Sequence, residues 1–432
     1  MASSTATMVN APPELHTQSE LPSGLRVYLR SDFNSRVLHV GLFVKHGSLH
    51  EDRDSSGLAH FIEHVVFNPR YFTPEVTAVY DRLVARGASY EASTTKEYTR
   101  FSVFCLPESI HEAVHFLSLL ARPQRPSQEA IETERSIVLH ERAMTLGSPG
   151  PLDTQWLDHA IWGESSLGLF ILGREANVRR FTQDDVEERM RAYYVPERML
   201  LGVVGPVAPE TLMPRVQQLF GDWSRGQQAI PEPTALAAPR TVALPAQSPR
   251  VTLQLGFLGG LGVTLGSEHR LPMELLGDVL GIGPRSRLFV QLRQEKKLAY
   301  LAHSTVMTYE LGGYLGVYIN CDRAAFKECY ATVRSTIAEL CAQGVGAAEL
   351  ERARLERLVA ILDSMEVNRK YLNLVGRRAL LGLPFDRDSE PGQIHAVTAG
   401  QVDAFARDLL ADARPAVVGI GLSEEELAEL PL

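Results

Sequence analysis

Residues 57–64 read GLAHFIEH and place three potentially catalytic side chains on one face of a helix. At about 100° per residue, His64 lies ~40° around the helix axis from His60, and Glu63 lies ~60° to the other side. Two imidazoles and one carboxylate therefore point the same way. Histidine is the commonest metal ligand in proteins, and a carboxylate beside a metal site can act as a base.

This spacing favours a catalytic zinc site rather than a structural one. Zinc in a catalytic site keeps one position open for a water molecule, whose pKa it lowers to about 7. Glu63 is then the side chain that would take the proton of this water. The order His-x-x-Glu-His reverses the commoner His-Glu-x-x-His. The motif predicts His60 and His64 as zinc ligands, but a third ligand has to come from elsewhere.

A competing His-Glu-x-x-His pattern occurs at residues 111–115. The apolar positions of this segment form one stripe, and His111 and His115 flank the stripe as on an ordinary amphipathic helix. The longer motif of metzincins is absent, because Ser118 and Ala121 replace its glycine and its third histidine. A distant acid such as Glu134 could still complete a site here, so this alternative stays open.

Two glutamates one heptad apart could supply the missing ligand. Residues 128–144 predict a strong helix, on which Glu134 and Glu141 lie within ~20° of each other. Two acids on one helical face can reach one metal site together.

Composition limits the other classes of function. The chain has 432 residues, 45% hydrophobic and 22% charged, which is typical of a globular protein with two or more domains. A net charge of -9 argues against a nucleic-acid-binding surface. Four cysteines without a Cys-x-x-Cys pair favour reduced thiols. Without a signal sequence or a long apolar run, we expect a soluble, cytoplasmic protein that does not bind membranes.

The predicted elements form two similar α+β halves. The expected domains are residues 1–224 and 250–432, joined by a linker rich in Pro, Ala and Gln at 225–249. Alternating patterns predict strands at 21–30, 37–46, 88–95, 99–106, 199–204, 250–257, 302–309, 313–319 and 416–420. Helical patterns cover 74–86, 107–121, 128–144, 181–193, 209–220, 270–280, 287–296, 324–343, 347–365 and 402–410. The repeated order suggests duplication.

Several further segments carry a resemblance to a known family. They are LPSGLRV at 21–27, KHGS at 45–48, GLAHFIEH at 57–64, ERSIVLHE at 134–141, YYVP at 193–196, VVG at 203–205, FGDW at 220–223, SRLF at 286–289, LR at 292–293 and LAY at 298–300. Together they resemble the M16 (pitrilysin) family of zinc metallopeptidases, specifically its short-chain branch, which includes the mitochondrial processing peptidase. The resemblance covers nearly the whole chain.

This resemblance implies a fold and a ligand set. The fold is the LuxS/MPP-like metallohydrolase fold, with two similar domains of mixed or antiparallel sheet packed with helices. The third zinc ligand of such proteins lies some 75 residues beyond the second histidine, and Glu141 lies 77 residues beyond His64. Glu134 matches an acid that orients the ligands. In such proteins the equivalent of Glu63 activates water and then protonates the leaving amine.

The resemblance also implies residues that bind substrate. Arg293 and Tyr300 match a pair that clasps the backbone of the substrate from the facing half. The strand at 88–95 matches the edge strand on which an extended peptide is laid. Here Glu91-Ala92 stands where the family usually has Asn-Ala, which suggests a preference for basic residues. Residues 65–70, VVFNPR, also depart from the common Lys-Gly-Thr after the zinc helix.

The function implied is a zinc-dependent endopeptidase that cleaves short or unfolded peptides, in a narrower form a dedicated processing enzyme for leader or precursor peptides. A half-length chain has to obtain its second half from another chain, so we expect a clamshell homodimer, or else a heterodimer with a related M16 chain. The alternative function is a noncatalytic partner or assembly subunit of such a heterodimer.

Overall fold

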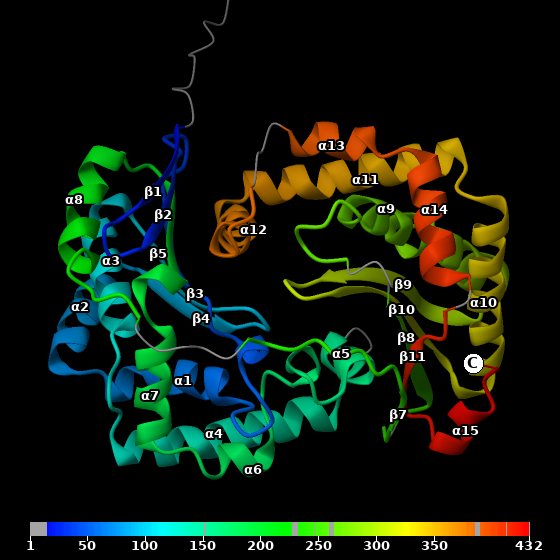
Figure 1. The fold of residues 1–432 in the computed structure, drawn as a ribbon, viewed down its shortest axis with the longest axis horizontal. Coiled ribbons are helices and arrows are strands. Elements are labelled where there is room, and N and C mark those ends of the chain that lie inside the picture. The colour runs from blue at the N-terminus through cyan, green and yellow to red at the C-terminus, as the bar shows by residue number, and fades with distance from the viewer. Residues whose placement is uncertain are drawn as a thin grey trace, which may run out of the picture.

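The computed structural model describes residues 15–150, 153–226, 232–246, 248–258, 263–384, 389–411 and 413–431. Two mixed sheets, each packed with helices, form the two halves of the chain (Figure 1). The predicted α+β class with two mixed sheets is therefore confirmed. None of the helices in these ranges is long and apolar enough to cross a membrane.

The first sheet has six strands in the order β1-β2-β6-β3-β5-β4. β2 and β6 are parallel, and the other neighbours are antiparallel. The strands are β1 (Leu15–Glu20), β2 (Arg26–Ser31), β3 (Leu38–Val44), β4 (Ser89–Thr94), β5 (Thr99–Cys105) and β6 (Met199–Gly205). β4 is thus an edge strand, as the resemblance implied.

The second sheet has five strands in the order β7-β11-β8-β10-β9, with β7 and β11 parallel. The strands are β7 (Thr241–Leu244), β8 (Arg250–Leu258), β9 (Ala299–Thr308), β10 (Gly313–Asp322) and β11 (Ala416–Ile420). Their order and directions repeat those of β2-β6-β3-β5-β4. This shared topology supports duplication of one ancestral half.

The first half contributes its own set of helices. They are α1 (Leu58–Phe67), α2 (Pro74–Ala85), α3 (Ile110–Ala121), α4 (Gln128–Gly147), α5 (Thr154–Trp162), α6 (Glu175–Val178), α7 (Gln183–Tyr193) and α8 (Pro209–Phe220). One face of β3, with Val40, Leu42 and Val44, packs into a buried core with apolar side chains of α1 and α3. Because strand side chains alternate, His39 and Phe43 point to the opposite face.

The second half contributes a π-helical segment (Phe289–Glu295) and the remaining helices. These are α9 (Arg270–Gly281), α10 (Phe326–Gln343), α11 (Ala347–Glu366), α12 (Asn368–Leu380), α13 (Glu390–Ala396), α14 (Ala399–Leu410) and α15 (Glu424–Ala428).

Each half lends one helix to the sheet of the other. α12 packs on β6, β3 and β2 of the first sheet, and α5 packs on β11 and β8 of the second (Figure 1). The sequence patterns predicted neither helix. The predicted linker also contains a strand, β7, that joins the second sheet. The domain limits at 224 and 250 stay a prediction.

A candidate metal centre

Helix α1 carries the centre, and its N-terminus is tightly defined. Gly57 precedes it with a φ of 98°, and a Cβ at this residue would lie 2.8 Å from the Cα of Gly173, so only glycine fits. The carboxylate of Glu51 accepts hydrogen bonds from the backbone N–H groups of Gly57 (2.8 Å) and Ala59 (2.6 Å). These bonds satisfy amides that the first turn of a helix leaves free.

The face of α1 that does not enter the core brings the predicted ligands together. The Nε2 atom of His64 lies 3.3 Å from Oε2 of Glu141, and Nε2 of His60 lies 3.8 Å from the same oxygen. Glu141 comes from α4, which packs beside α1. His60, His64 and Glu141 are the group among the described residues whose atoms could hold one metal ion.

An outer ring of hydrogen bonds orients these ligands. The buried Glu134 accepts a hydrogen bond from Nδ1 of His64 at 3.2 Å through one oxygen, and from Nδ2 of Asn68 at 2.5 Å through the other. A carboxylate behind a ligating histidine fixes the ring and leaves Nε2 for the metal. Asn68 was not among the predicted residues, and it lies in the segment that departs from the family sequence.

Charges at the centre are arranged for a cation. Burial, together with the neighbouring His64, lowers the pKa of His60 to about 4, so this imidazole is neutral. Burial alone would lower the pKa of His64, but hydrogen bonds to Glu134 and Glu141 raise it to about 9. The hydrogen bond with His64 lowers the pKa of Glu141. The carboxylates around His64 thus favour positive charge at this position.

The donor set fits zinc. Two imidazoles and a carboxylate are typical of a catalytic site with an open position. Ligands about 2.0–2.2 Å from a tetrahedral zinc lie roughly 3.4 Å from one another, and the measured separations of 3.3 and 3.8 Å are close to this. The three side chains could therefore hold the ion after only small movements.

Glu63 lies beside this cluster, held by a neighbouring strand. The hydroxyl of Thr94, at the end of β4, donates a hydrogen bond to Oε2 of Glu63. Burial raises the pKa of Glu63 against the opposing effects of Thr94 and His64. A raised pKa brings a carboxylate closer to the range in which a general base works well. Thr94 was not predicted, because only the folded sheet brings it to α1.

The predicted substrate-binding residues lie in two places. Glu91 and Ala92 are on the edge strand β4, and Glu91 is paired with arginines. Arg293 lies over the rings of Phe289 and Tyr300, at 5.2 and 5.4 Å from their centroids. Tyr300 is 62% exposed. Arg293 and Tyr300 therefore form a cluster within the second half, away from α1 in the sequence and in the described contacts.

The alternative histidine pair is not assembled into a site. His115 lies 3.8 Å from the exposed Glu75 of α2, and Glu134 faces His64 instead. Within the described ranges, His111 and His115 do not form a group with a third residue whose atoms could hold one metal ion.

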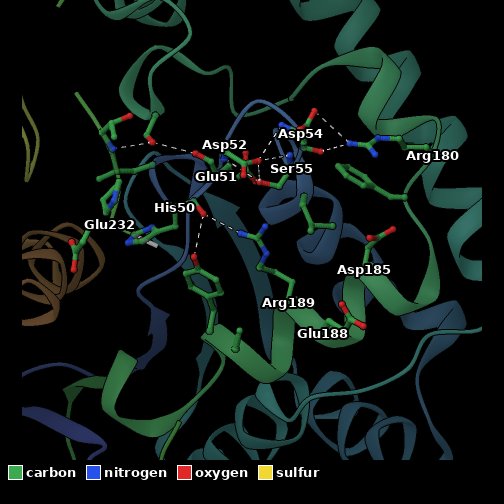
Figure 2. A pocket seen from close by; sticks show the side chains of 18 of the residues that line it. His50, Glu51, Asp52, Asp54, Ser55, Arg180, Asp185, Glu188, Arg189 and Glu232 are labelled. Carbon is green, nitrogen blue, oxygen red and sulfur yellow. Dashed lines mark hydrogen bonds and ion pairs between the residues drawn. The ribbon is translucent and has the colours of Figure 1, made fainter. Parts of the chain in front are cut away.

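A cavity of about 780 Å³ lies at the N-terminal end of α1 (Figure 2). Its wall includes Glu51, several exposed acids such as Asp185 and Glu188, and Arg189. None of the residues of the metal centre lines it, so this cavity is separate from the proposed chemistry.

Fold and site define a class of protein, and two family matches identify it. Residues 26–174 match the family described as Insulinase (Peptidase family M16), and residues 180–356 match the Peptidase M16 inactive domain. The chain belongs to the M16 peptidase family.

Individual relatives agree with this assignment. YmxG of Bacillus subtilis, named an uncharacterized zinc protease, is 27% identical over 90% of this chain and 94% of its own. A protein of Arabidopsis thaliana, named a probable mitochondrial-processing peptidase subunit beta, is 24% identical over 93% of this chain and 77% of its own. The crystal structure of a protease from Helicobacter pylori shares the fold, with a TM-score of 0.83 at 18% identity over 95% of this chain and all of its own.

Proposed function

We propose that the protein is a zinc-dependent endopeptidase that cleaves short or unfolded peptides. The observation that carries this proposal is the convergence of His60, His64 and Glu141 beside a half-buried acid, Glu63. Relatives named zinc proteases support the metal and the class of reaction.

In this proposal His60, His64 and Glu141 hold the zinc ion, and Glu134 keeps His64 in the orientation that ligation requires. Bound zinc would supply an acidified water and a Lewis acid for the scissile carbonyl. Glu63 would accept the proton of the attacking water and pass it to the leaving amine. The hydroxyl of Thr94 would hold the carboxylate of Glu63 in place for both transfers.

The substrate would bind as an added strand. In the described part of the chain β4 is the last strand of its sheet, and an extended peptide that pairs with its outer edge would pass beside Thr94 and Glu63. Ala92 lies on this strand two residues before Thr94. Arg293 and Tyr300 of a second chain would donate hydrogen bonds to the peptide backbone from the facing side.

A dedicated cytoplasmic processing enzyme for leader or precursor peptides is the narrower form of this proposal. A noncatalytic subunit would not need both a complete ligand set and a base. A peptide-cleavage assay with and without a chelator separates the two functions, because only the enzyme loses activity when zinc is removed.

Glu63→Gln tests the assigned base. The amide cannot accept the proton, so kcat should fall by about 10²- to 10⁴-fold while zinc content stays at the wild-type level. Activity is measured on a quenched fluorescent peptide, and zinc by elemental analysis. Unchanged turnover in this variant would show that Glu63 is not the base.

His60→Ala should release zinc, whereas His111→Ala is the matched control and should retain it.

A further inference from the structure

The two faces of β4 differ in what they can offer to a bound peptide. Thr94 points to α1, where it meets Glu63. Glu91 points to the opposite face of the sheet, where it meets Arg369 of α12. Side chains of a peptide added to this edge would alternate in the same way. Those next to Glu91 would therefore lie on the α12 side.

A cavity of about 340 Å³ opens on this side, and we call it the β4–α12 cavity. Its wall is formed by β3, β4, β5 and α12, including His39, Phe104 and Leu372. Its volume is sufficient for one side chain, and Phe104, 39% exposed, offers an apolar surface to the methylene groups of that side chain.

Cations exceed anions in the β4–α12 cavity. Glu91 is its acid, and Arg100 (2.7 Å) and Arg369 (3.3 Å) bind one oxygen each of its carboxylate. Arg100 is 8% exposed, donates to Asn373 and has a buried Nε without a partner among the described side chains. Arg369, in contrast, is exposed and has donors to spare.

Two guanidinium groups around one carboxylate leave a net positive charge. Burial and Arg369 lower the pKa of His39 against the opposing effect of Glu91, so this imidazole adds no charge at neutral pH. A third cation would add repulsion between like charges. A second carboxylate would balance the site and meet the free donors of Arg369.

We propose that the β4–α12 cavity is a specificity pocket for an acidic side chain, Asp or Glu, of a peptide bound along β4, and that Arg369 selects it. This inference rests on the proposed peptidase function. It differs from the preference for basic residues suggested by Glu91 in the sequence, because the folded chain neutralises Glu91 with two arginines from distant positions.

The test separates binding from cleavage. A single Glu, Gln or Lys is moved along an otherwise neutral, fluorescein-labelled peptide, and binding to the zinc-loaded Glu63→Gln protein is measured by anisotropy. At one position of the peptide, the Glu peptide should bind about three- to fivefold more tightly than the Lys peptide, as expected for one partly exposed ion pair. Arg369→Glu should reverse this preference, and Lys370→Glu, the same charge change at the next residue of α12, should not.

Each outcome has a distinct meaning. Equal binding of the Glu and Lys peptides at every position, or the same profile for Arg369→Glu and Lys370→Glu, overturns the pocket. Cleavage of these peptides by the wild-type enzyme is assayed in parallel. If the Glu peptide binds more tightly but no peptide is cleaved, the result supports the pocket and contradicts the peptidase function. If the peptides are cleaved but the Glu and Lys peptides bind equally, the result supports the peptidase function and contradicts the pocket. Arg369 and Lys370 are both exposed, so the two substitutions should not disturb the core. Thermal unfolding verifies that the variants fold.

Discussion

Single residues outside the motif hold the metal centre in shape. Glu51 binds the first amides of α1, Asn68 binds Glu134, and Thr94 binds Glu63. Asn68 directly follows the zinc helix and Thr94 ends the edge strand, but only their contacts reveal their roles. Each acts on one side chain or one helix end, so each can be tested by a single substitution.

Glu51 should make the stability of the protein depend on pH. Burial raises its pKa to about 7 from an ordinary value of 4.5, against the effect of its two backbone hydrogen bonds. The folded state then binds a proton more tightly than the unfolded state, so stability falls as pH rises from about 4.5 to about 7. The free energy of unfolding lost through Glu51 over this pH range is of order 3 kcal/mol at most.

Glu51→Gln should remove this dependence. Relative to the wild type, the zinc-loaded variant should gain stability between pH 5 and about pH 7.5, as measured by urea unfolding. Glu188→Gln, at an exposed position of the same cavity (Figure 2), is the matched control. Its free energy of unfolding should depend on pH as that of the wild type does. A stability difference between Glu51→Gln and wild type that does not vary with pH would contradict the assignment.

Among the elements, α12 joins the two halves by close packing. Tyr371, Leu372 and Val375 share a buried cluster with Tyr28 and Phe43 of the first sheet. Glycines permit this approach. A Cβ at Gly376 would lie 2.4 Å from Cζ of Phe43, whose side chain is fully buried.

Gly376→Ala should therefore destabilise the protein. Alanine favours a helix by about 1 kcal/mol over glycine, but overpacking a tight core costs about 1–3 kcal/mol. We expect a net loss of about 1 kcal/mol in the free energy of unfolding. Gly392→Ala in α13 is the control, because no atom lies within 4 Å of the added methyl group. Gly392→Ala should be more stable than wild type. If both alanine variants were more stable than wild type, the packing argument would be refuted.

At the scale of the whole molecule, the tip of the β9–β10 hairpin ties the second half to the first. Glu97 pairs with Arg377 and accepts a hydrogen bond from the backbone N–H of Glu310, and Lys45 pairs with the carboxylate of Glu310 at 2.6 Å. These contacts begin three residues after Thr94. The second half is therefore anchored close to the end of β4, where Thr94 holds Glu63.

The remaining prediction concerns assembly. Arg293 and Tyr300 lie together in the second half, so we expect them to serve the metal centre of a partner chain. A hybrid dimer of Glu63→Gln with Arg293→Ala/Tyr300→Phe would then contain one doubly damaged site and one intact site. The isolated hybrid should show about half the wild-type activity if the two sites act independently.

Two results would contradict this arrangement. A hybrid as inactive as both parents would mean that Arg293 and Tyr300 do not act in trans. A monomer by light scattering would remove the shared site altogether, and a requirement for a different M16 chain would replace the homodimer by the heterodimer.

The sequence alone determined the family, the class of enzyme, the zinc cofactor and most elements of both sheets. Local periodicity predicted the elements and the shared face of the zinc motif, because residues at i, i+3 and i+4 share a helical face and alternate residues share a strand face. The family and the class of enzyme came from the resemblance of the quoted segments to M16 peptidases. The spacing between His64 and Glu141 predicted a ligand pair only through resemblance, since 77 residues of chain carry no geometric information by themselves.

Tertiary structure alone decided which faces meet. That α5 and α12 pack on the sheet of the other half could not be predicted, because the apolar side of a helix does not identify the surface that covers it. The charge of the β4–α12 cavity was likewise not readable from Glu91, whose two arginine partners come from β5 and α12. Side chains far apart in sequence become neighbours only when the two halves pack, so their combined charge is a property of the folded chain.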